Sequence, residues 1–313
     1  AVAVLRSACQ ERAPATQALP PAAATAPVAA PLASTASAST EAASPAPVPV
    51  SPLASLTADD LKGRAPIDLY EKSQRSASFD ACLHAFPAPS AREAMRAKEG
   101  QIELCSTEFA VLYSTAHKTP WVVLERLDSH QLKDAQGEDR YDKFYADPRL
   151  KTAQSAQLSD YARSGYDRGH LAPAGDQPFP AAMAQSFALS NMVPQDPTHN
   201  RKVWNKLEQD VRKYSLRAQG DVFVWSGVLF EGERKTIGKG EVAVPSHLYK
   251  VMYDDHNRRA WAWVLPNEAT AKLEAPMRYT DFLARTGLDW LSGLPMQAGL
   301  PAPCDGGAGI CPP

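Results

Sequence analysis

The sequence predicts a mixed α+β domain built around a central antiparallel sheet flanked by helices. Runs of aromatic and β-branched residues, which are typical of buried strands, recur along the chain at 109–113, 121–127, 221–230, 242–245, 248–253 and 260–265. Helical patterns interrupt these strands at about 91–98, 200–217 and 278–286. A turn at Lys118-Thr119-Pro120 separates the first two strands. Strands interrupted by occasional helices favour an α+β domain over an all-helical one.

The composition divides the chain into a low-complexity segment and a globular domain. Residues 13–53 are almost entirely Ala, Pro, Ser, Thr and Val, and they hold nine of the 27 prolines. Such a stretch has few large side chains to bury and cannot offset the entropy lost on ordering. We therefore predict a disordered tether over residues 13–65, a single globular domain over 66–292 and a C-terminal tail over 293–313.

The first twelve residues resemble the remnant of a signal sequence. Residues 1–5 (AVAVL) could be the end of a signal-peptide apolar region. Ser7-Ala8-Cys9 resembles the end of a bacterial lipoprotein signal, although Arg6 stands where that pattern has an apolar residue. No run of about 18 apolar residues predicts a membrane-spanning helix. We expect a periplasmic or secreted protein, with a lipid anchor at Cys9 as an open alternative.

The pairing expected of the cysteines depends on whether the compartment is oxidising or reducing. The five cysteines are Cys9, Cys82, Cys105, Cys304 and Cys311. In an oxidising compartment, Cys82–Cys105 and Cys304–Cys311 are the simplest pairs, which leaves Cys9 for a lipid. The alternative is a cytosolic protein with five reduced thiols.

Charge gives a local signal only. The whole chain is nearly balanced, with 33 basic and 35 acidic residues. Residues 148–217 hold ten Lys and Arg against six acids, a local excess that suits a polyanionic partner. An ordinary solvated helix face would give the same count.

The segment 166–208 supplies the groups that phosphodiester hydrolysis needs. A histidine such as His170 can deprotonate water near neutral pH. Arginines or a divalent metal can neutralise the charge that develops on phosphate, and Mg²⁺ prefers oxygen ligands such as an Asn carbonyl. If 200–217 is an α-helix, Asn200 and Glu208 lie about 80° apart around its axis and about 12 Å apart along it. We therefore expect Asn200 to bind the metal directly and Glu208 to reach its waters, with Trp204 packed beneath. The alternative is a helix-terminal Asn200 and a surface Glu208.

The motifs in this segment resemble a known family. DRGH at Asp167–His170 is followed across Leu189–Glu208 by the ordered pattern LSN…PQ…N…W…LE. This combination resembles the DNA/RNA non-specific endonuclease family, which includes the Serratia nuclease and endonuclease G. A looser similarity extends from Trp121 to Pro266.

The resemblance implies a ββα-metal (His-Me finger) nuclease fold. It implies an Mg²⁺-dependent endonuclease, with Mn²⁺ as a substitute, that cleaves DNA and RNA through contacts to the phosphate backbone and leaves 5′-phosphate ends. A homodimer is a further expectation, since relatives often dimerise.

The resemblance also implies a role for each matched residue. His170 matches the general base, Asn200 the single direct metal ligand and Glu208 the acid that holds the water shell of the metal. Asn191 matches an asparagine that keeps the base and metal regions in register, and Arg168 matches an arginine near the phosphate. The arginine that stabilises the transition state usually lies upstream. Arg140 is the first candidate for it and Arg126 the second.

Two other functions stay open at this point. One is a catalytically silent envelope protein that binds nucleic acid, for example during uptake. The other is a phosphodiesterase restricted to small nucleotides.

Among the other histidines, His199 lies beside Asn200 and could contact phosphate, although we expect it at the surface.

Overall fold

The computed structural model describes residues 51–136, 141 and 143–297, all of which belong to one compact unit. Four residues that carry sequence predictions, Cys9, Arg140, Cys304 and Cys311, lie outside the described residues. The same holds for the predicted tether up to residue 50 and for the tail from residue 298.

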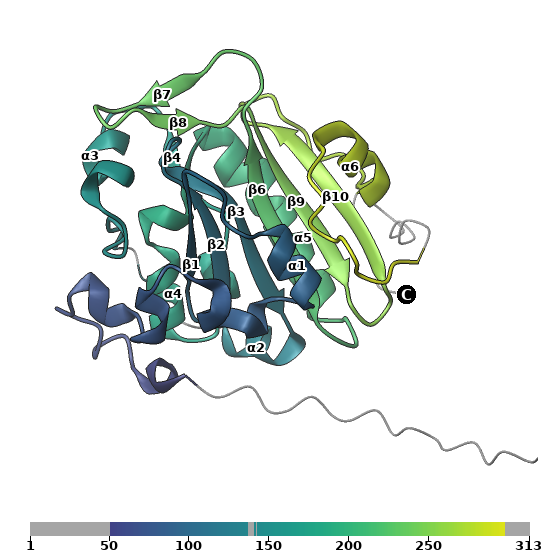
Figure 1. Ribbon diagram of the computed structural model, residues 1–313, viewed down its shortest axis with the longest axis horizontal. Helices are drawn as coiled ribbons and strands as arrows, with labels where there is room; N and C mark the ends of the chain where they lie inside the picture. The colour runs from purple at the N-terminus through teal and green to yellow at the C-terminus, as the bar shows by residue number, and fades with distance from the viewer. Residues whose placement is uncertain (1–50, 137–140, 142, 298–313) are drawn as a thin grey trace, which may run out of the picture. The chain divides into compact units, whose positions relative to one another are not determined.

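A seven-stranded antiparallel sheet forms the centre of the unit (Figure 1). In spatial order its strands are β1 (Gln101–Cys105), β2 (Phe109–Ser114), β3 (Thr119–Leu127), β6 (Val222–Leu229), β9 (His247–Asp254), β10 (Arg259–Pro266) and β11 (Met277–Arg278). The predicted α+β class with a central antiparallel sheet is therefore confirmed.

Helices cover both faces of this sheet. The α-helices are α1 (Pro89–Ala94), α2 (Ser129–Asp134), α3 (Leu158–Tyr161), α4 (Pro180–Ser186), α5 (Asn205–Ser215) and α6 (Tyr279–Thr286). The 3₁₀ turns are η1 (Pro52–Ser55), η2 (Pro66–Leu69), η3 (Ser73–Arg75), η4 (Phe79–Ala85), η5 (Thr152–Gln154), η6 (Ala174–Asp176) and η7 (Leu189–Asn191), and η8 (His199–Trp204) is a π-helix.

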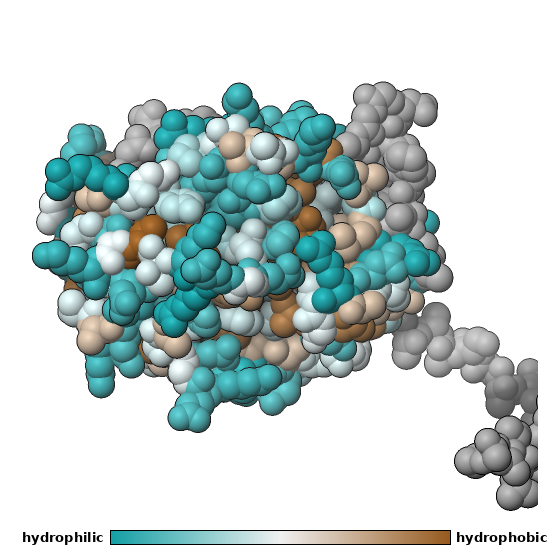
Figure 2. All heavy atoms as spheres, turned by 90° about the horizontal axis from the view of Figure 1, so that it is seen from above, coloured by the Kyte–Doolittle hydropathy of each residue, from teal (hydrophilic) through white to brown (hydrophobic). Residues whose placement is uncertain are grey.

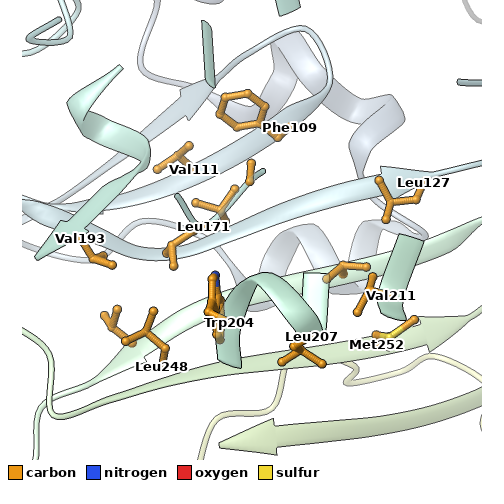
Figure 3. Packing of buried hydrophobic residues seen from close by; sticks show 14 of the residues in the cluster. Phe109, Val111, Leu127, Leu171, Val193, Trp204, Leu207, Val211, Leu248 and Met252 are labelled. Carbon is orange, nitrogen blue, oxygen red and sulfur yellow. The ribbon is translucent and has the colours of Figure 1, made fainter. Parts of the chain in front are cut away.

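Strand β6 shows how a hydrophobic core arises on each of the two faces of the central sheet. Side chains alternate between the faces of a strand. Val222 and Val224 therefore join the core under α5, while Phe223 and Trp225 join the core under α1 and α6. Figure 3 shows the first core, where Trp204, Leu207 and Val211 lie among residues of the sheet. A strand that is buried on both faces reads as a continuous apolar run, which is how the sequence predicted it.

Two smaller sheets complete the strand inventory of the described residues. Strands β4 (Asp167–His170) and β5 (Met192–Gln195) pair antiparallel, as do β7 (Lys235–Ile237) and β8 (Val242–Val244). The chain runs from β5 through the π-helix η8 directly into α5. Strands β4 and β5 with this helix form the β–β–helix unit that carries the DRGH motif.

The globular unit begins upstream of the predicted boundary at residue 66. Leu61 is buried, and Leu53 and Leu56 pack against the same cluster as Phe187. Residues 53–61 therefore belong to the packed unit and not to a tether. The Ala/Pro/Ser-rich composition ends near residue 53, and the leucines that follow supply apolar surface that can be buried.

A disulfide joins η4 to β1. Cys82 and Cys105 are bonded, with a Cα–Cα distance of 5.6 Å, which confirms the predicted pair.

Figure 2 shows one face of the molecule, where hydrophilic residues dominate and apolar ones form small separate patches. In the part of the chain that the structure describes, no helix is long and apolar enough to cross a membrane.

Candidate active site

Four of the predicted site residues meet in one open cleft of about 540 Å³. Its lining comes from β4 and the turn after it, from η8 and α5, and from one upstream aromatic residue. The lining residues are Phe144, Asp167, Arg168, His170, Pro173, Ala174, Gly175, Asn200, Arg201, Asn205, Glu208 and Arg212. The structure thus brings together His170, Asn200, Glu208 and Arg168, as the sequence predicted.

His170, the last residue of β4, is held by contacts to its ring and to its backbone. Its half-buried imidazole meets the ring of Phe187 edge-to-face at a centroid distance of 4.8 Å, and the ring of Phe144 lies 5.8 Å away. The indole Nε1 of Trp204 donates a 3.2 Å hydrogen bond to the His170 carbonyl oxygen. Trp204 is fully buried, which confirms that it packs beneath the site.

Asn191 braces the backbone after His170 and does not line the cleft. Its buried Oδ1 accepts a 2.9 Å hydrogen bond from the Ala172 N–H, and its Nδ2 donates to the carbonyl oxygens of Ala172 and Ser186 at 2.9 and 2.8 Å. This side chain is placed to keep β4 in register. It does not reach into the cleft, so we treat it as a positioning residue and not as a catalytic one.

Gln195 explains the glycine in DRGH. Its side chain lies across Gly169, where a Cβ atom would stand only 1.8 Å from the Gln195 Oε1 atom. The Nε2 of Gln195 contacts Nδ1 of His199 at 2.7 Å. His199 is fully buried, and burial lowers its pKa to about 4. The expected surface position of His199 is therefore wrong, because its ring packs beside Trp204 behind the cleft.

Asp167 fixes the orientation of the Asn200 amide. Nδ2 of Asn200 donates a 3.0 Å hydrogen bond to Asp167 Oδ2, and Arg201 donates two more to the same carboxylate. Burial raises the pKa of Asp167, but the hydrogen bonds from Arg201 and Asn200 outweigh it and leave the pKa below its ordinary value. An ionised carboxylate only accepts hydrogen bonds, so the amide must turn its NH₂ group toward Asp167. The carbonyl oxygen of Asn200 is thereby kept for another partner.

The helix differs from the prediction around Asn200. Residues 199–204 form a π-helix and the α-helix begins only at Asn205, so the angle predicted for a regular α-helix does not apply. Single π turns are frequent at functional sites. Asn200 and Glu208 nevertheless line the same cleft.

Glu208 and Arg212 face the cleft one turn apart on α5. Burial raises the pKa of Glu208 to about 7, while the nearby Lys250 ammonium acts in the opposite direction. Arg212 forms an ion pair with Asp176, whose side chain is only 2% exposed. The sequence prediction missed Arg212, although its i,i+4 spacing from Glu208 places both residues on one helix face.

The other two arginines that the sequence singled out and the structure describes lie in different places. The guanidinium carbon of Arg168 lies 4.1 Å from the centre of the Phe144 ring, at the cleft. Arg126 instead pairs with Asp221 at 3.2 Å and with Asp128 at 3.6 Å, and it lines a different cavity. The second candidate for the upstream arginine is therefore wrong, because two carboxylates hold Arg126 away from the cleft.

The donor set in the cleft suits a hard divalent cation. Among the described residues, no group of three or more His, Cys, Asp or Glu side chains could hold a metal ion. The oriented carbonyl oxygen of Asn200 and the carboxylate of Glu208 are oxygen donors in one cleft. Mg²⁺ keeps several waters and needs only one or two protein oxygens, so these residues fit it.

Comparison with known proteins identifies relatives of this domain. The family model of the DNA/RNA non-specific endonucleases matches residues 87–297. The human mitochondrial nuclease EXOG is 36% identical over 208 residues, which cover 61% of this chain and 55% of that protein. Nuclease C1 of Cunninghamella echinulata var. echinulata is 38% identical over 192 residues, covering 54% of this chain and 75% of that protein.

A solved structure is similar as well. In the crystal structure of the EndoG/EndoGI complex, the matching chain has a TM-score of 0.56 and 28% identity, with 60% of this chain and 84% of that chain covered. The match spans about half the length of the human and mouse EXOG proteins. The family model, in contrast, covers most of the described residues. The chain therefore belongs to the DNA/RNA non-specific endonuclease family.

Proposed function

We propose that this protein is a metal-dependent endonuclease that hydrolyses phosphodiester bonds of DNA and RNA. The observation that carries the proposal is that the imidazole of His170 and the oriented amide of Asn200 line one cleft. Three arginines, Arg168, Arg201 and Arg212, line the same cleft and suit a polyanionic substrate.

In the proposed reaction, His170 acts as the general base. Its imidazole takes a proton from a water molecule, and the oxygen of that water forms a bond to phosphorus. The bond between phosphorus and the 3′ oxygen breaks, and the 3′ oxygen takes a proton from solvent. The products carry a 5′-phosphate and a 3′-hydroxyl. The T-shaped contact with Phe187 and the backbone bond from Trp204 keep the imidazole in place for this transfer.

The remaining cleft residues would bind the metal ion and neutralise charge on the phosphate. Asn200 would hold Mg²⁺, or Mn²⁺ in its place, through its carbonyl oxygen, and Glu208 would hold the water shell. A bound divalent cation would neutralise charge on the phosphate and on the leaving oxygen. Arg168 is oriented by stacking on Phe144, so its guanidinium is ready to contact a phosphate oxygen. Contacts to phosphate alone carry no sequence information, which supports cleavage without sequence preference.

We also propose that the protein works in an oxidising compartment, periplasmic or extracellular. The Cys82–Cys105 disulfide supports this proposal, because such bonds persist mainly in oxidising environments. Thiol alkylation of the protein extracted from its native cells tests it: we expect Cys82 and Cys105 to be protected until a reductant is added. Alkylation of both without reductant would contradict it. The homodimer and the lipid anchor at Cys9 stay predictions.

A nuclease assay separates the candidate functions. Supercoiled plasmid and a structured RNA are incubated with the purified protein in Mg²⁺ and then in EDTA, with a dinucleotide as a third substrate. We expect nicking of the plasmid and cleavage of the RNA in Mg²⁺, and neither in EDTA. Binding without cleavage would favour the silent nucleic-acid-binding protein. Cleavage of the dinucleotide alone would favour the small-nucleotide phosphodiesterase.

A further inference from the structure

A buried lysine lies beneath the cleft. Lys250, on β9, is 1% exposed, although it belongs to the residue type that is rarely buried without a partner. Its neighbours Leu248 and Met252 point into the core under α5, so the alternation of the strand directs Lys250 to the same face. An ammonium group in such a place costs free energy unless other groups compensate for it.

Three partners hold the ammonium group. Nζ of Lys250 donates a 2.6 Å hydrogen bond to Oγ of Ser226, which stands directly opposite on β6. A longer contact of 3.4 Å reaches the carbonyl oxygen of Leu171, the residue after His170. The same nitrogen lies 4.8 Å from the centre of the Trp204 ring, within the range of a cation–π interaction.

These contacts converge on the end of β4. The carbonyl of His170 accepts from the indole of Trp204, and the next carbonyl, that of Leu171, accepts from Lys250. The two donors also touch each other. The strand that carries the base is thus tied through Lys250 to β6 and β9, and through Trp204 to the helix that carries Asn200.

The surrounding charges explain why an apolar residue would not serve as well. Glu125, on β3, faces the same core, is 1% exposed and accepts a 3.3 Å hydrogen bond from Nε2 of Gln177. Burial raises the pKa of Glu125 and of Glu208, and the Lys250 ammonium acts in the opposite direction on both, as does Arg212. An uncharged side chain at position 250 would remove one of these two cations.

We propose that Lys250 is a positioning residue of the active site, which anchors the end of β4 so that the imidazole of His170 keeps its place relative to α5. The inference rests on the proposed function, because it assigns the effect to the base. It predicts that loss of the ammonium lowers kcat and leaves KM for nucleic acid unchanged, since Arg168 and Arg201 are untouched.

The test compares three variants of the full chain. Lys250→Met removes the ammonium and keeps the length of the side chain. Met252→Ala opens a cavity in the same core two residues along the strand and serves as the control for lost stability. Ser226→Ala removes one partner of Lys250 without removing its charge, and it carries the test should Lys250→Met fail to fold.

Two readouts are needed. The first is kcat and KM on plasmid at saturating Mg²⁺, corrected for the folded fraction. The second is the NMR shift of the His170 Cε1–H proton in the metal-free protein, assigned by its absence in His170→Ala. This shift senses the distance and tilt between the imidazole and the Phe187 ring. It can be measured even if the protein proves not to be a nuclease, so the two proposals can fail separately.

We expect Lys250→Met to lose at least tenfold in kcat with KM within twofold, and to move the His170 resonance. Ser226→Ala should show a smaller change of the same kind, and Met252→Ala should melt earlier with an unchanged resonance. An unmoved His170 resonance in a folded Lys250→Met or Ser226→Ala variant would overturn the proposal. A fall in kcat no larger than that of Met252→Ala would overturn it as well.

Discussion

The Nδ2 of Asn200 donates a 3.0 Å hydrogen bond to the carboxylate of Asp167, so the first residue of DRGH sets the orientation of the amide that we assign to the metal. Asp167 also binds Arg201, whose side chain is 70% exposed. The motif therefore joins the strand of the base to the helix of the metal ligand through one carboxylate.

Replacement of Asp167 should weaken the binding of the metal ion. In Asp167→Ala the amide of Asn200 can rotate, and loss of such an outer partner typically costs about 10- to 100-fold in metal affinity or activity. The measurement is the Mg²⁺ concentration that gives half-maximal cleavage. Arg201→Ala is the matched control, because it removes the other partner of Asp167 and leaves the Asn200 bond intact; we expect a smaller shift. The same Mg²⁺ titration for Asp167→Ala and the wild type would contradict this prediction.

The affinity of the protein for Mg²⁺ should rise as the pH is raised. The pKa of Glu208 in the metal-free protein is raised to about 7, chiefly by burial, so this carboxyl is largely protonated below that pH. The waters of a bound metal ion would donate hydrogen bonds to this group, which must then be a carboxylate, so affinity should rise from about pH 6 to about pH 7 and level off above it. Calorimetric titration with Mg²⁺, without nucleic acid, measures this slope. Glu208→Gln should flatten it, and a wild-type affinity constant over the same range would refute the assignment.

A side chain at position 169 should distort the site. In Gly169→Ala, the new Cβ would stand 1.8 Å from the Gln195 Oε1 atom, and fully buried Gln195 has little room to move. Overpacking of this kind costs about 1–3 kcal/mol of unfolding free energy. Urea denaturation of Gly169→Ala, Gln195→Ala and the double variant measures the coupling. We expect the double variant to lose less than the sum of the two single variants, whereas additive losses would show that the two side chains do not collide.

The central strands and the site could be predicted from the sequence because their signals are local. The apolar run at 221–230 becomes β6 (Val222–Leu229), and DRGH with the later Asn and Glu marks the cleft. The residue pattern alone did not indicate strand β4, because Asp-Arg-Gly-His has neither alternation nor β-branched residues and becomes a strand only by pairing with β5. The π turn was missed because helical periodicity does not separate a π turn from an α turn.

The supporting charges could not be predicted for a different reason. Lys250 lies in a run read only as a strand, and nothing in its neighbours along the chain indicates that tertiary packing brings it onto Trp204. The same applies to Asp176, which meets Arg212 from a distant turn. His199 was misplaced because histidine beside a metal ligand looks like a surface group, whereas Gln195 and Trp204 hold it inside. Long-range packing decides these positions, and a single sequence does not encode it as a pattern.

The most direct test of the account is the cleavage rate of His170→Ala. Removal of a general base typically lowers the rate by about 100- to 10,000-fold. The three cleft arginines and the metal oxygens stay in place, so the variant should fold, bind plasmid DNA with near wild-type affinity and leave it supercoiled in Mg²⁺. A His170→Ala protein that nicks plasmid at the wild-type rate would contradict the assignment of the base and, with it, the proposed mechanism.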